Sequence, residues 1–284
     1  MQNLSGIDMK RKTERKGLAL VAVIMVLCAC SAMSETWKWA SYGLPPSDLK
    51  TCIPDTRGEA DSWWIPYVQN KLKQPKHDLL FLGDSITDLW TYPADHTYPG
   101  GLDTWNARFK AIATNYGVTG DKTQTVLWRL TEGGALDGYA PKQIVLLIGI
   151  NNLLQGDTPA DTAAGVKGVV DHLLLRLPEA RVLVLGIFPC RASPADPIRA
   201  KIRETNDLIR KLADGRRVGF VDLGSTFLEP DGSITLAVMR DLLHLSPQGY
   251  AMWAESLAPH LQTLRGNADL PGGRDAADGA TTGK

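Results

Sequence analysis

LLFLGDSITDLW, residues 79–90, joins an apolar strand candidate over 78–83 to the start of a helix through a Gly-Asp-Ser triplet. A serine between a strand and a helix is exposed at the edge of a sheet, and the helix N-terminus favours negative charge that develops beside it. The Gly-x-Ser-x-Gly elbow of lipases is absent at this position. A Gly-Asp-Ser triplet alone is most often a turn with a helix cap, so the case for Ser85 as a nucleophile depends on other residues.

Further apolar runs alternate with segments of helical period. The strand candidates are 111–117, 143–149, 182–187 and 218–223, and helices are predicted over 158–177, over 198–212 and after the cap pair Ser246-Pro247. The runs at 143–149 and 182–187 show no polar alternation, which is typical of strands covered on both faces in a parallel sheet. Five βα units predict an α/β fold, a three-layer α/β/α sandwich with a five-stranded parallel sheet. Ligands bind such folds at the carboxyl ends of the strands.

A serine nucleophile needs a base with a pKa near 7 and a group that orients this base. Four of the five histidines lie before the first strand, in a loop or within helices, namely His77, His96, His172 and His260. His244 instead follows the last strand candidate, and Asp241 precedes it by three residues. This spacing puts two side chains on one face of a turn, so Asp241 would orient His244 toward Ser85. Spacing alone equally allows a loop histidine that is packed by its neighbours.

Acyl transfer also needs hydrogen-bond donors for the oxyanion, and each donor typically contributes about 10²- to 10³-fold in rate. The second strand candidate leads into Gly120, whose backbone N–H is one candidate donor. The third leads into Asn151, whose side-chain amide is another. Taken singly, each residue is better interpreted as part of a turn at a strand end. Four such signals at four strand ends, in a workable order, favour serine hydrolase chemistry.

The order Gly-Asp-Ser, Gly, Asn and Asp-x-x-His resembles the SGNH, or GDSL, hydrolase superfamily, and within it the intracellular platelet-activating-factor acetylhydrolases. The resemblance spans about 79–261 and rests on FLGDSITDLW, NYGVTGDKTQTVLWRL, PKQIVLLIGINNL, ARVLVLGIFPC, FVDLGSTF, DGSI and DLLHLSPQGY. It implies a flavodoxin-like sheet, hydrolysis of small acyl esters, often acetyl esters, and no metal or organic cofactor. Relatives of this kind also associate as dimers, so the resemblance leaves a homodimer open.

Carried over residue by residue, the resemblance implies Ser85 as the nucleophile, His244 as the base and Asp241 as the orienting group. It also implies an oxyanion hole formed by Gly120, Asn151 and the backbone N–H of Ser85. Two positions depart from the family, which often has Gly where Thr119 stands and Thr where Ile150 stands. Neither change removes a catalytic group, and both are expected to alter the acyl pocket.

The amino terminus has the pattern of an export signal. Five basic residues within 10–16 precede an apolar run over 17–29, and the 13 residues of this run are too few to span a bilayer. The run ends in Leu-Cys-Ala-Cys, which resembles a bacterial lipobox, so 1–29 is the predicted lipoprotein signal peptide and Cys30 the predicted lipidation site. The lipid would anchor the chain to a membrane. Ser31 favours the outer membrane, facing the periplasm or the cell surface. An ordinary cleaved signal peptide and a buried core helix are the alternatives.

Residues 30–76 are predicted to be a tether and an amino-terminal lead, 77–265 the hydrolase domain, and 266–284 a disordered tail. The lead is rich in tryptophan, which either packs on the domain or forms a sugar-stacking surface: Trp37, Trp39, Trp63 and Trp64. The loop over 92–101 is expected either to shape the substrate mouth or to be a plain surface loop. Cys52 and Cys190 allow one disulfide, and neither has the spacing of a zinc ligand.

The sequence therefore predicts a serine esterase that removes acetyl or other short acyl groups from small-molecule or glycan esters, with carbohydrate esters favoured. A lipid or phospholipid ester is the alternative substrate. A non-catalytic glycan-binding protein on the same fold and an acyltransferase are the alternative classes. The formal net charge is zero and no basic stripe occurs, which disfavours nucleic acid as a partner.

Overall fold

The sheet is parallel throughout and has five strands. The computed structural model describes residues 49–58, 61–266 and 270. The strands are β1 (Leu79–Gly83), β2 (Ala113–Gly117), β3 (Gln143–Leu147), β4 (Arg181–Leu185) and β5 (Val218–Val221), in the spatial order β2-β1-β3-β4-β5. The predicted five-stranded parallel sheet is confirmed, and each strand boundary lies within about two residues of the predicted one.

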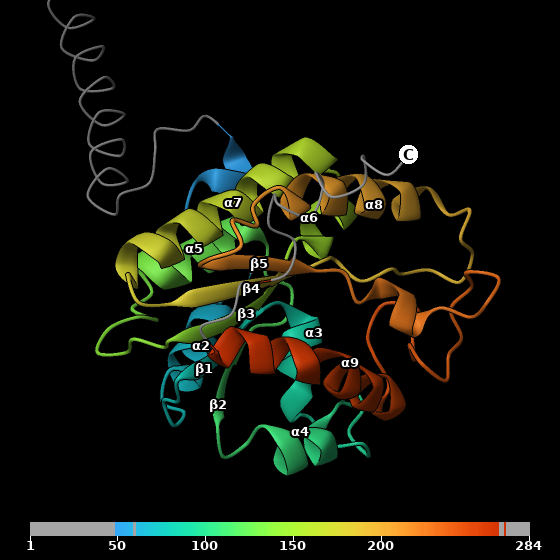
Figure 1. Ribbon diagram of the computed structural model, residues 1–284, viewed down its shortest axis with the longest axis horizontal. Helices are drawn as coiled ribbons and strands as arrows, with labels where there is room; N and C mark the ends of the chain where they lie inside the picture. Colours follow the sequence, from blue (N-terminus) through green and yellow to red (C-terminus); the bar gives the residue numbers. More distant parts are fainter. Residues whose placement is uncertain (1–48, 59–60, 267–269, 271–284) are drawn as a thin grey trace, which may run out of the picture. The chain divides into compact units, whose positions relative to one another are not determined.

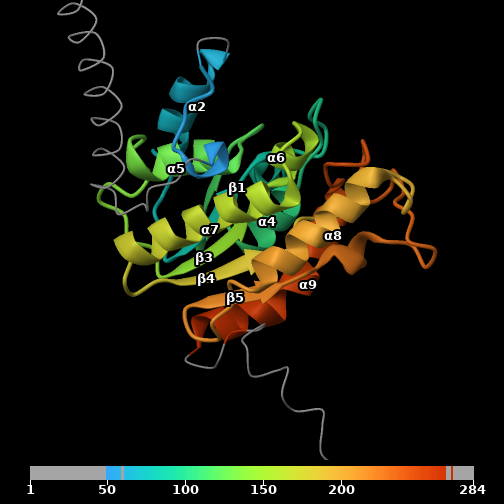
Figure 2. The same cartoon turned by 90° about the horizontal axis from the view of Figure 1, so that it is seen from above.

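Helices cover both faces of the sheet. In chain order they are η1 (Lys50–Cys52), α2 (Trp64–Lys71), α3 (Ser85–Asp88), η3 (Leu89–Thr91), α4 (Leu102–Arg108), α5 (Thr123–Thr131), α6 (Ile150–Leu154), α7 (Pro159–Arg176), α8 (Pro197–Arg210), η4 (Gly224–Phe227) and α9 (Pro247–Arg265). Figure 1 shows α5, α7 and α8 on one face and α4 and α9 on the other, and Figure 2 shows α7 and α8 side by side. The predicted three-layer sandwich is confirmed. The three predicted helices are α7, α8 and α9, and each begins with proline after a capping side chain.

The strand order places a topological switch point between β1 and β3. The chain leaves β1 for β2 on one side and then crosses to β3 on the other, so these two connections cover opposite faces of the sheet. The register pairs Gly83 with both Gly117 and Leu147, and the three strands therefore end at one level. Ser85 and the loops after β2 and β3 thus share the edge at which such sheets bind ligands.

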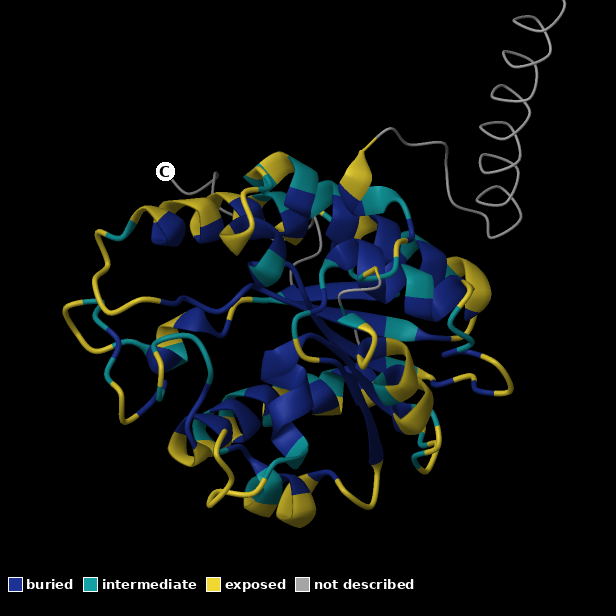
Figure 3. Ribbon diagram, turned by 180° about the vertical axis from the view of Figure 1, so that it is seen from behind, coloured by how far each residue is buried: buried dark blue, intermediate teal, exposed yellow. Residues whose placement is uncertain are grey.

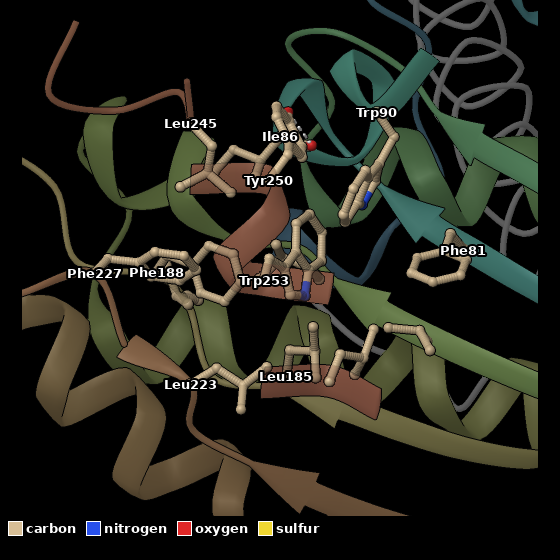
Figure 4. Packing of buried hydrophobic residues seen from close by; sticks show 14 of the residues in the cluster. Phe81, Ile86, Trp90, Leu185, Phe188, Leu223, Phe227, Leu245, Tyr250 and Trp253 are labelled. Carbon is tan, nitrogen blue, oxygen red and sulfur yellow. Dashed lines mark hydrogen bonds between the residues drawn. The ribbon is translucent and has the colours of Figure 1, made fainter. Parts of the chain in front are cut away.

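The core between the sheet and α9 contains a cluster of packed aromatic rings. Trp90, Tyr250 and Trp253 are fully buried, and the ring centroid of Trp90 lies 4.6 Å from Tyr250 and 4.8 Å from Trp253 (Figure 4). The Tyr250 hydroxyl donates a 2.7 Å hydrogen bond to the carbonyl of Ile86. Figure 3 shows that the strands are buried along most of their length. This packing fixes α3, which begins at Ser85, against the long helix α9.

Several predictions for the chain ends concern residues outside the described ranges. The signal peptide 1–29, Cys30 as lipidation site, Trp37 and Trp39 all lie there, as does most of the tail. Leu270, within the predicted tail, is buried, and its backbone N–H donates a 2.8 Å hydrogen bond to the Gly215 carbonyl. The packed core therefore continues past α9 to Leu270.

Cys52 and Cys190 are both free thiols, so the disulfide that the sequence allowed does not form. Among the helices that the structure describes, none is long and apolar enough to cross a bilayer.

Candidate active site

Ser85 is the first residue of α3, two positions after the end of β1. The Asp84 carboxylate caps this helix and accepts a 3.0 Å hydrogen bond from the Ile86 backbone N–H. The turn needs glycine at position 83, because a Cβ there would lie 2.2 Å from the Leu147 carbonyl oxygen of β3. This close approach of backbone to backbone holds the Ser85 hydroxyl at the carboxyl end of the sheet.

The structure brings Ser85, His244 and Asp241 together, although Ser85 and His244 are 159 positions apart along the chain. Ser85 Oγ lies 2.9 Å from His244 Nε2, and His244 Nδ1 lies 2.7 Å from Asp241 Oδ2. The first distance suits proton transfer from a nucleophile to a base, and the second suits a hydrogen bond that orients the base. The three side chains therefore have the geometry of a Ser-His-Asp triad.

The turn at 241–244 aims the Asp241 carboxylate at the imidazole. Asp241 Oδ1 accepts hydrogen bonds from the backbone N–H groups of Leu243 at 3.1 Å and His244 at 2.7 Å, while Oδ2 faces His244 Nδ1. Partial burial acts to raise the pKa of Asp241, but the interactions with His244, chiefly its ring and backbone hydrogen bonds, and the nearby Arg240 charge together hold this pKa well below its usual range. An ionised Asp241 favours the tautomer with the proton on Nδ1, so Nε2 can accept the Ser85 proton.

The donors predicted for an oxyanion lie on three neighbouring segments. Gly120 has a φ of +79°, which favours glycine, and its N–H donates to none of the described residues. The Ser85 N–H lies in the first turn of α3, where a helix supplies no acceptor. Asn151 Nδ2 donates a 2.9 Å hydrogen bond to the Asp121 carbonyl and keeps a second N–H. This bond ties α6 to the loop that carries Gly120.

Asp88 is a buried carboxylate for which the sequence predicted no role, and it connects α3 to this loop. Asp88 Oδ2 accepts hydrogen bonds from the Thr119 N–H at 3.1 Å and the Thr119 hydroxyl at 2.9 Å. The Tyr67 hydroxyl donates to Asp88 Oδ1 at 2.8 Å, and Lys71 Nζ lies 2.6 Å from the same oxygen. Tyr67 and Lys71 belong to α2, so the amino-terminal lead is built into the site. Thr119, noted above as a departure from the family, anchors the loop that leads to Gly120.

A second buried ion pair fixes the far side of that loop. Arg129 of α5 lies 2.8 Å from Asp121 and donates hydrogen bonds to the carbonyls of Tyr116 and Gly83, at the ends of β2 and β1. Trp64 Nε1 donates a 2.8 Å hydrogen bond to Asp121 Oδ1. Burial raises the pKa of Asp121 to about 6, although Arg129 acts in the opposite direction. The loop that contains Gly120 is therefore held on both sides by buried charged groups.

The Ser85–His244 pair faces a cavity of about 460 Å³. Apart from this pair, half of its lining residues are aromatic: Trp63, Tyr67, Asp88, Leu89, Tyr92, Tyr98, Thr119 and Arg240. The loop over 92–101 thus shapes the cavity through Tyr92 and Tyr98, and the lead contributes Trp63. Trp63 is 44% exposed and Tyr98 57% exposed, so parts of both rings are open to solvent.

The other residues predicted from the sequence do not line this cavity. Trp64 is buried, with its ring centroid 5.1 Å from that of Trp128, so it packs on the domain. Ile150 is buried in the main apolar core. Gly120 and Asn151 are not among the residues that line the cavity. Within the described ranges, no group of His, Cys, Asp and Glu side chains is arranged to hold a metal ion.

Comparison with known proteins agrees with this geometry. Residues 81–252 match the GDSL-like lipase/acylhydrolase family. The platelet-activating factor acetylhydrolase IB subunit alpha1 of Bos taurus is 35% identical over 239 residues, covering 80% of this chain and 96% of its own. The alpha2 subunit of Rattus norvegicus is 33% identical over 213 residues, covering 72% and 86%.

Solved structures share the fold at low sequence identity. A GDSL-like lipase of Bacteroides thetaiotaomicron superposes with a TM-score of 0.55 at 16% identity, over 70% of this chain and 97% of its own. A catalytic mutant of an acetylxylan esterase from Geobacillus stearothermophilus gives 0.51 at 18% identity, over 69% and 95%. Together with the family match and the sequence relatives, these findings identify the chain as a member of the GDSL-like lipase/acylhydrolase family and a carboxylic ester hydrolase.

Proposed function

We propose that this protein hydrolyses short-chain acyl esters through an acyl-enzyme formed on Ser85. His244 Nε2 takes the Ser85 proton as Oγ attacks the ester carbonyl carbon, and then gives this proton to the departing alcohol. A water molecule, deprotonated by the same nitrogen, attacks the acyl-enzyme and releases the acid. The observation that carries the proposal is the pair of 2.9 Å and 2.7 Å contacts that joins Ser85, His244 and Asp241 at the carboxyl edge of the sheet.

In the proposed mechanism, the developing oxyanion accepts hydrogen bonds from Gly120 N–H, Ser85 N–H and Asn151 Nδ2. Donors of this kind lower the barrier most when they are already in place before the reaction. The contacts of Thr119 with Asp88, and of Asn151 with the carbonyl that follows Gly120, support such a rigid arrangement.

The substrates that we favour are acetyl and other short acyl esters of carbohydrate. Trp63 and Tyr98 present partly exposed rings at the cavity, and an apolar ring face suits the C–H face of a sugar. The acetylxylan esterase with a similar fold is compatible with this choice. A phospholipid acetyl ester is the second candidate, because the relatives at 33–35% identity are named as acetylhydrolases of platelet-activating factor.

An ester panel tests both parts of the proposal. With p-nitrophenyl acetate, butyrate and octanoate, we expect kcat/KM to be highest for acetate, because the cavity of about 460 Å³ must also receive the alcohol half. With natural esters at equal concentration, acetate release is expected to be faster from an acetylated oligosaccharide than from an acetyl phospholipid. Hydrolysis of no ester in the panel would refute the chemistry, and faster release from the phospholipid would refute the carbohydrate assignment.

We also propose, from the sequence alone, that the chain is exported and carries a lipid on Cys30. The motif Leu-Cys-Ala-Cys after the apolar run supports this proposal. Expressed in a bacterium, the mature chain is expected to begin at Cys30 with the added mass of a lipid. Cys30→Ser is expected to lose this mass, whereas the matched change Cys28→Ser keeps it. Mass spectrometry that finds a mature terminus at another residue, or an unmodified Cys30, would reject the proposal.

A further inference from the structure

One wall of the cavity carries a cation whose hydrogen-bond donors are unused. Arg240 lines the cavity together with Ser85 and His244, and its side chain is 17% exposed. A guanidinium has five N–H donors, yet Arg240 donates a hydrogen bond to none of the residues in the described ranges, and its buried Nε has no partner there. Its ionic contact is with Asp241 Oδ2 at 3.9 Å, which is too long for a hydrogen bond. Hydrogen-bond donors without a partner cost free energy where they are shielded from water. Arg240 is therefore available to bind a hydrogen-bond acceptor on a ligand.

The other charges at this cavity are already matched. Asp88 is paired with Lys71 at 2.6 Å. Asp241 accepts two backbone N–H groups and the His244 ring N–H. The charge of Asp241 balances that of Arg240, but its oxygens already accept three hydrogen bonds, so the N–H donors of Arg240 remain open to a ligand.

The aromatic rings of the lining also face cations. The Arg57 guanidinium lies 5.1 Å from the centroid of the Trp63 ring, and Lys71 Nζ lies 5.7 Å from that of Tyr67. The Arg240 guanidinium itself lies 5.4 Å from the centroid of Tyr98. Cations beside these rings disfavour a further cation on the substrate, such as the quaternary ammonium group of choline. These contacts favour an anionic substituent on the substrate over a cationic one.

We propose that Arg240 is a specificity-determining residue that binds a carboxylate on the alcohol half of the ester, so that the preferred substrates are O-acetylated acidic sugars. This inference rests on the proposed function of the same site. A planar guanidinium binds a planar carboxylate through two parallel hydrogen bonds. The exposed rings of Trp63 and Tyr98 would contact the sugar that carries the carboxylate.

The experiment measures a ratio of kcat/KM between two matched esters, an O-acetylated methyl galacturonoside and the corresponding O-acetylated methyl galactoside. Wild type is expected to prefer the acidic ester by about 10- to 100-fold, the range that one charge-assisted hydrogen bond gives. The preference is expected to shrink at high salt, because a partly exposed charge is screened. Arg240→Gln is expected to bring the ratio close to one, and Arg240→Lys to retain part of the preference. Both esters are measured on the same variant, so a change in overall activity cancels from the ratio.

Arg203→Gln is the matched control, because Arg203 is an exposed arginine of α8 that lines a different cavity, and it is expected to keep the wild-type ratio. A wild-type ratio near one, or a ratio that Arg240→Gln leaves unchanged, overturns the inference while ester hydrolysis still supports the proposed function. An enzyme that hydrolyses neither these esters nor p-nitrophenyl acetate overturns the proposed function itself. In a third arm, faster turnover of an acetyl phosphocholine lipid than of the acidic sugar also overturns the inference.

Discussion

Ser85→Ala is expected to lower kcat for p-nitrophenyl acetate by on the order of 10⁶-fold, because alanine has no hydroxyl with which to form the acyl-enzyme. A slow residual rate above the uncatalysed one is expected, since the candidate oxyanion donors Gly120 and Asn151 stay in place. The fold should survive the change. The Ser85 side chain makes its hydrogen bond to His244, and the cap of α3 comes from Asp84. Steady-state kinetics and thermal unfolding of the purified variant measure the two effects separately.

The matched control is Ser225→Ala, which removes the hydroxyl of an exposed serine in η4. This variant is expected to equal wild type in both kcat and melting temperature. An organophosphonate ester gives an independent readout, because it should modify wild type once, on the peptide that contains Ser85, and leave Ser85→Ala unmodified by mass spectrometry. Activity of Ser85→Ala within tenfold of wild type, or an adduct on another residue, would show that the nucleophile lies elsewhere.

The sheet and the long helices were predictable because their signals are local. The uninterrupted apolar runs of β3 and β4 and the Ser246-Pro247 cap of α9 can each be recognised within a few residues. The strand order is different, because it depends on which strands meet after the chain has folded. No periodicity encodes it, and it was expected only from the family resemblance. Helices α3 and α6, with four and five residues, are too short to show a helical period.

The candidate triad was predictable for a related reason. Parallel strands bring their carboxyl ends to one edge, so side chains that follow different strands meet there without any sequence proximity. Asp241 and His244 are three residues apart, a spacing that predicts contact between their side chains. The distance of 2.7 Å between Asp241 Oδ2 and His244 Nδ1 agrees with this prediction. The catalytic roles of Ser85, Asp241 and His244, and of the donors Gly120 and Asn151, remain predictions until activity is measured.

The buried charged groups around the site could not be predicted from the sequence. Charged residues are almost always exposed unless they are paired, so nothing in the sequence marks Lys71 or Asp88 as buried. Lys71 of α2 meets Asp88 of α3 only in the folded chain, and Arg129 of α5 likewise meets Asp121 of the loop after β2 only there. The role of Arg240 could not be predicted either, because only the folded structure shows that its side chain lacks a hydrogen-bond partner. The lead, predicted as a tether with a packing segment, thus supplies part of the cavity wall.

Asp241→Asn is expected to lower kcat by about 10³- to 10⁴-fold with little change in KM, although the two side chains have nearly the same shape. The turn explains why. The position of Asp241 Oδ1 faces two backbone N–H groups, those of Leu243 and His244, and only an oxygen can accept both. The asparagine must therefore place its NH₂ group where Oδ2 was, facing His244 Nδ1. The imidazole then has to accept at Nδ1 and carry its proton on Nε2, which is the wrong tautomer for removing the Ser85 proton.

A loss of stability would not reproduce this pattern, because the variant keeps both backbone contacts of the turn and its melting temperature should stay near that of wild type. Asp231→Asn is the matched control, since Asp231 Oδ1 accepts the Ser233 backbone N–H at 2.9 Å in a similar turn and lies outside the cavity lining. It is expected to leave kcat and KM unchanged. If Asp241→Asn keeps kcat within tenfold of wild type, the tautomer of His244 does not depend on Asp241. If KM rises while kcat is unchanged, Asp241 acts on substrate binding, and the orienting role assigned to it here is wrong.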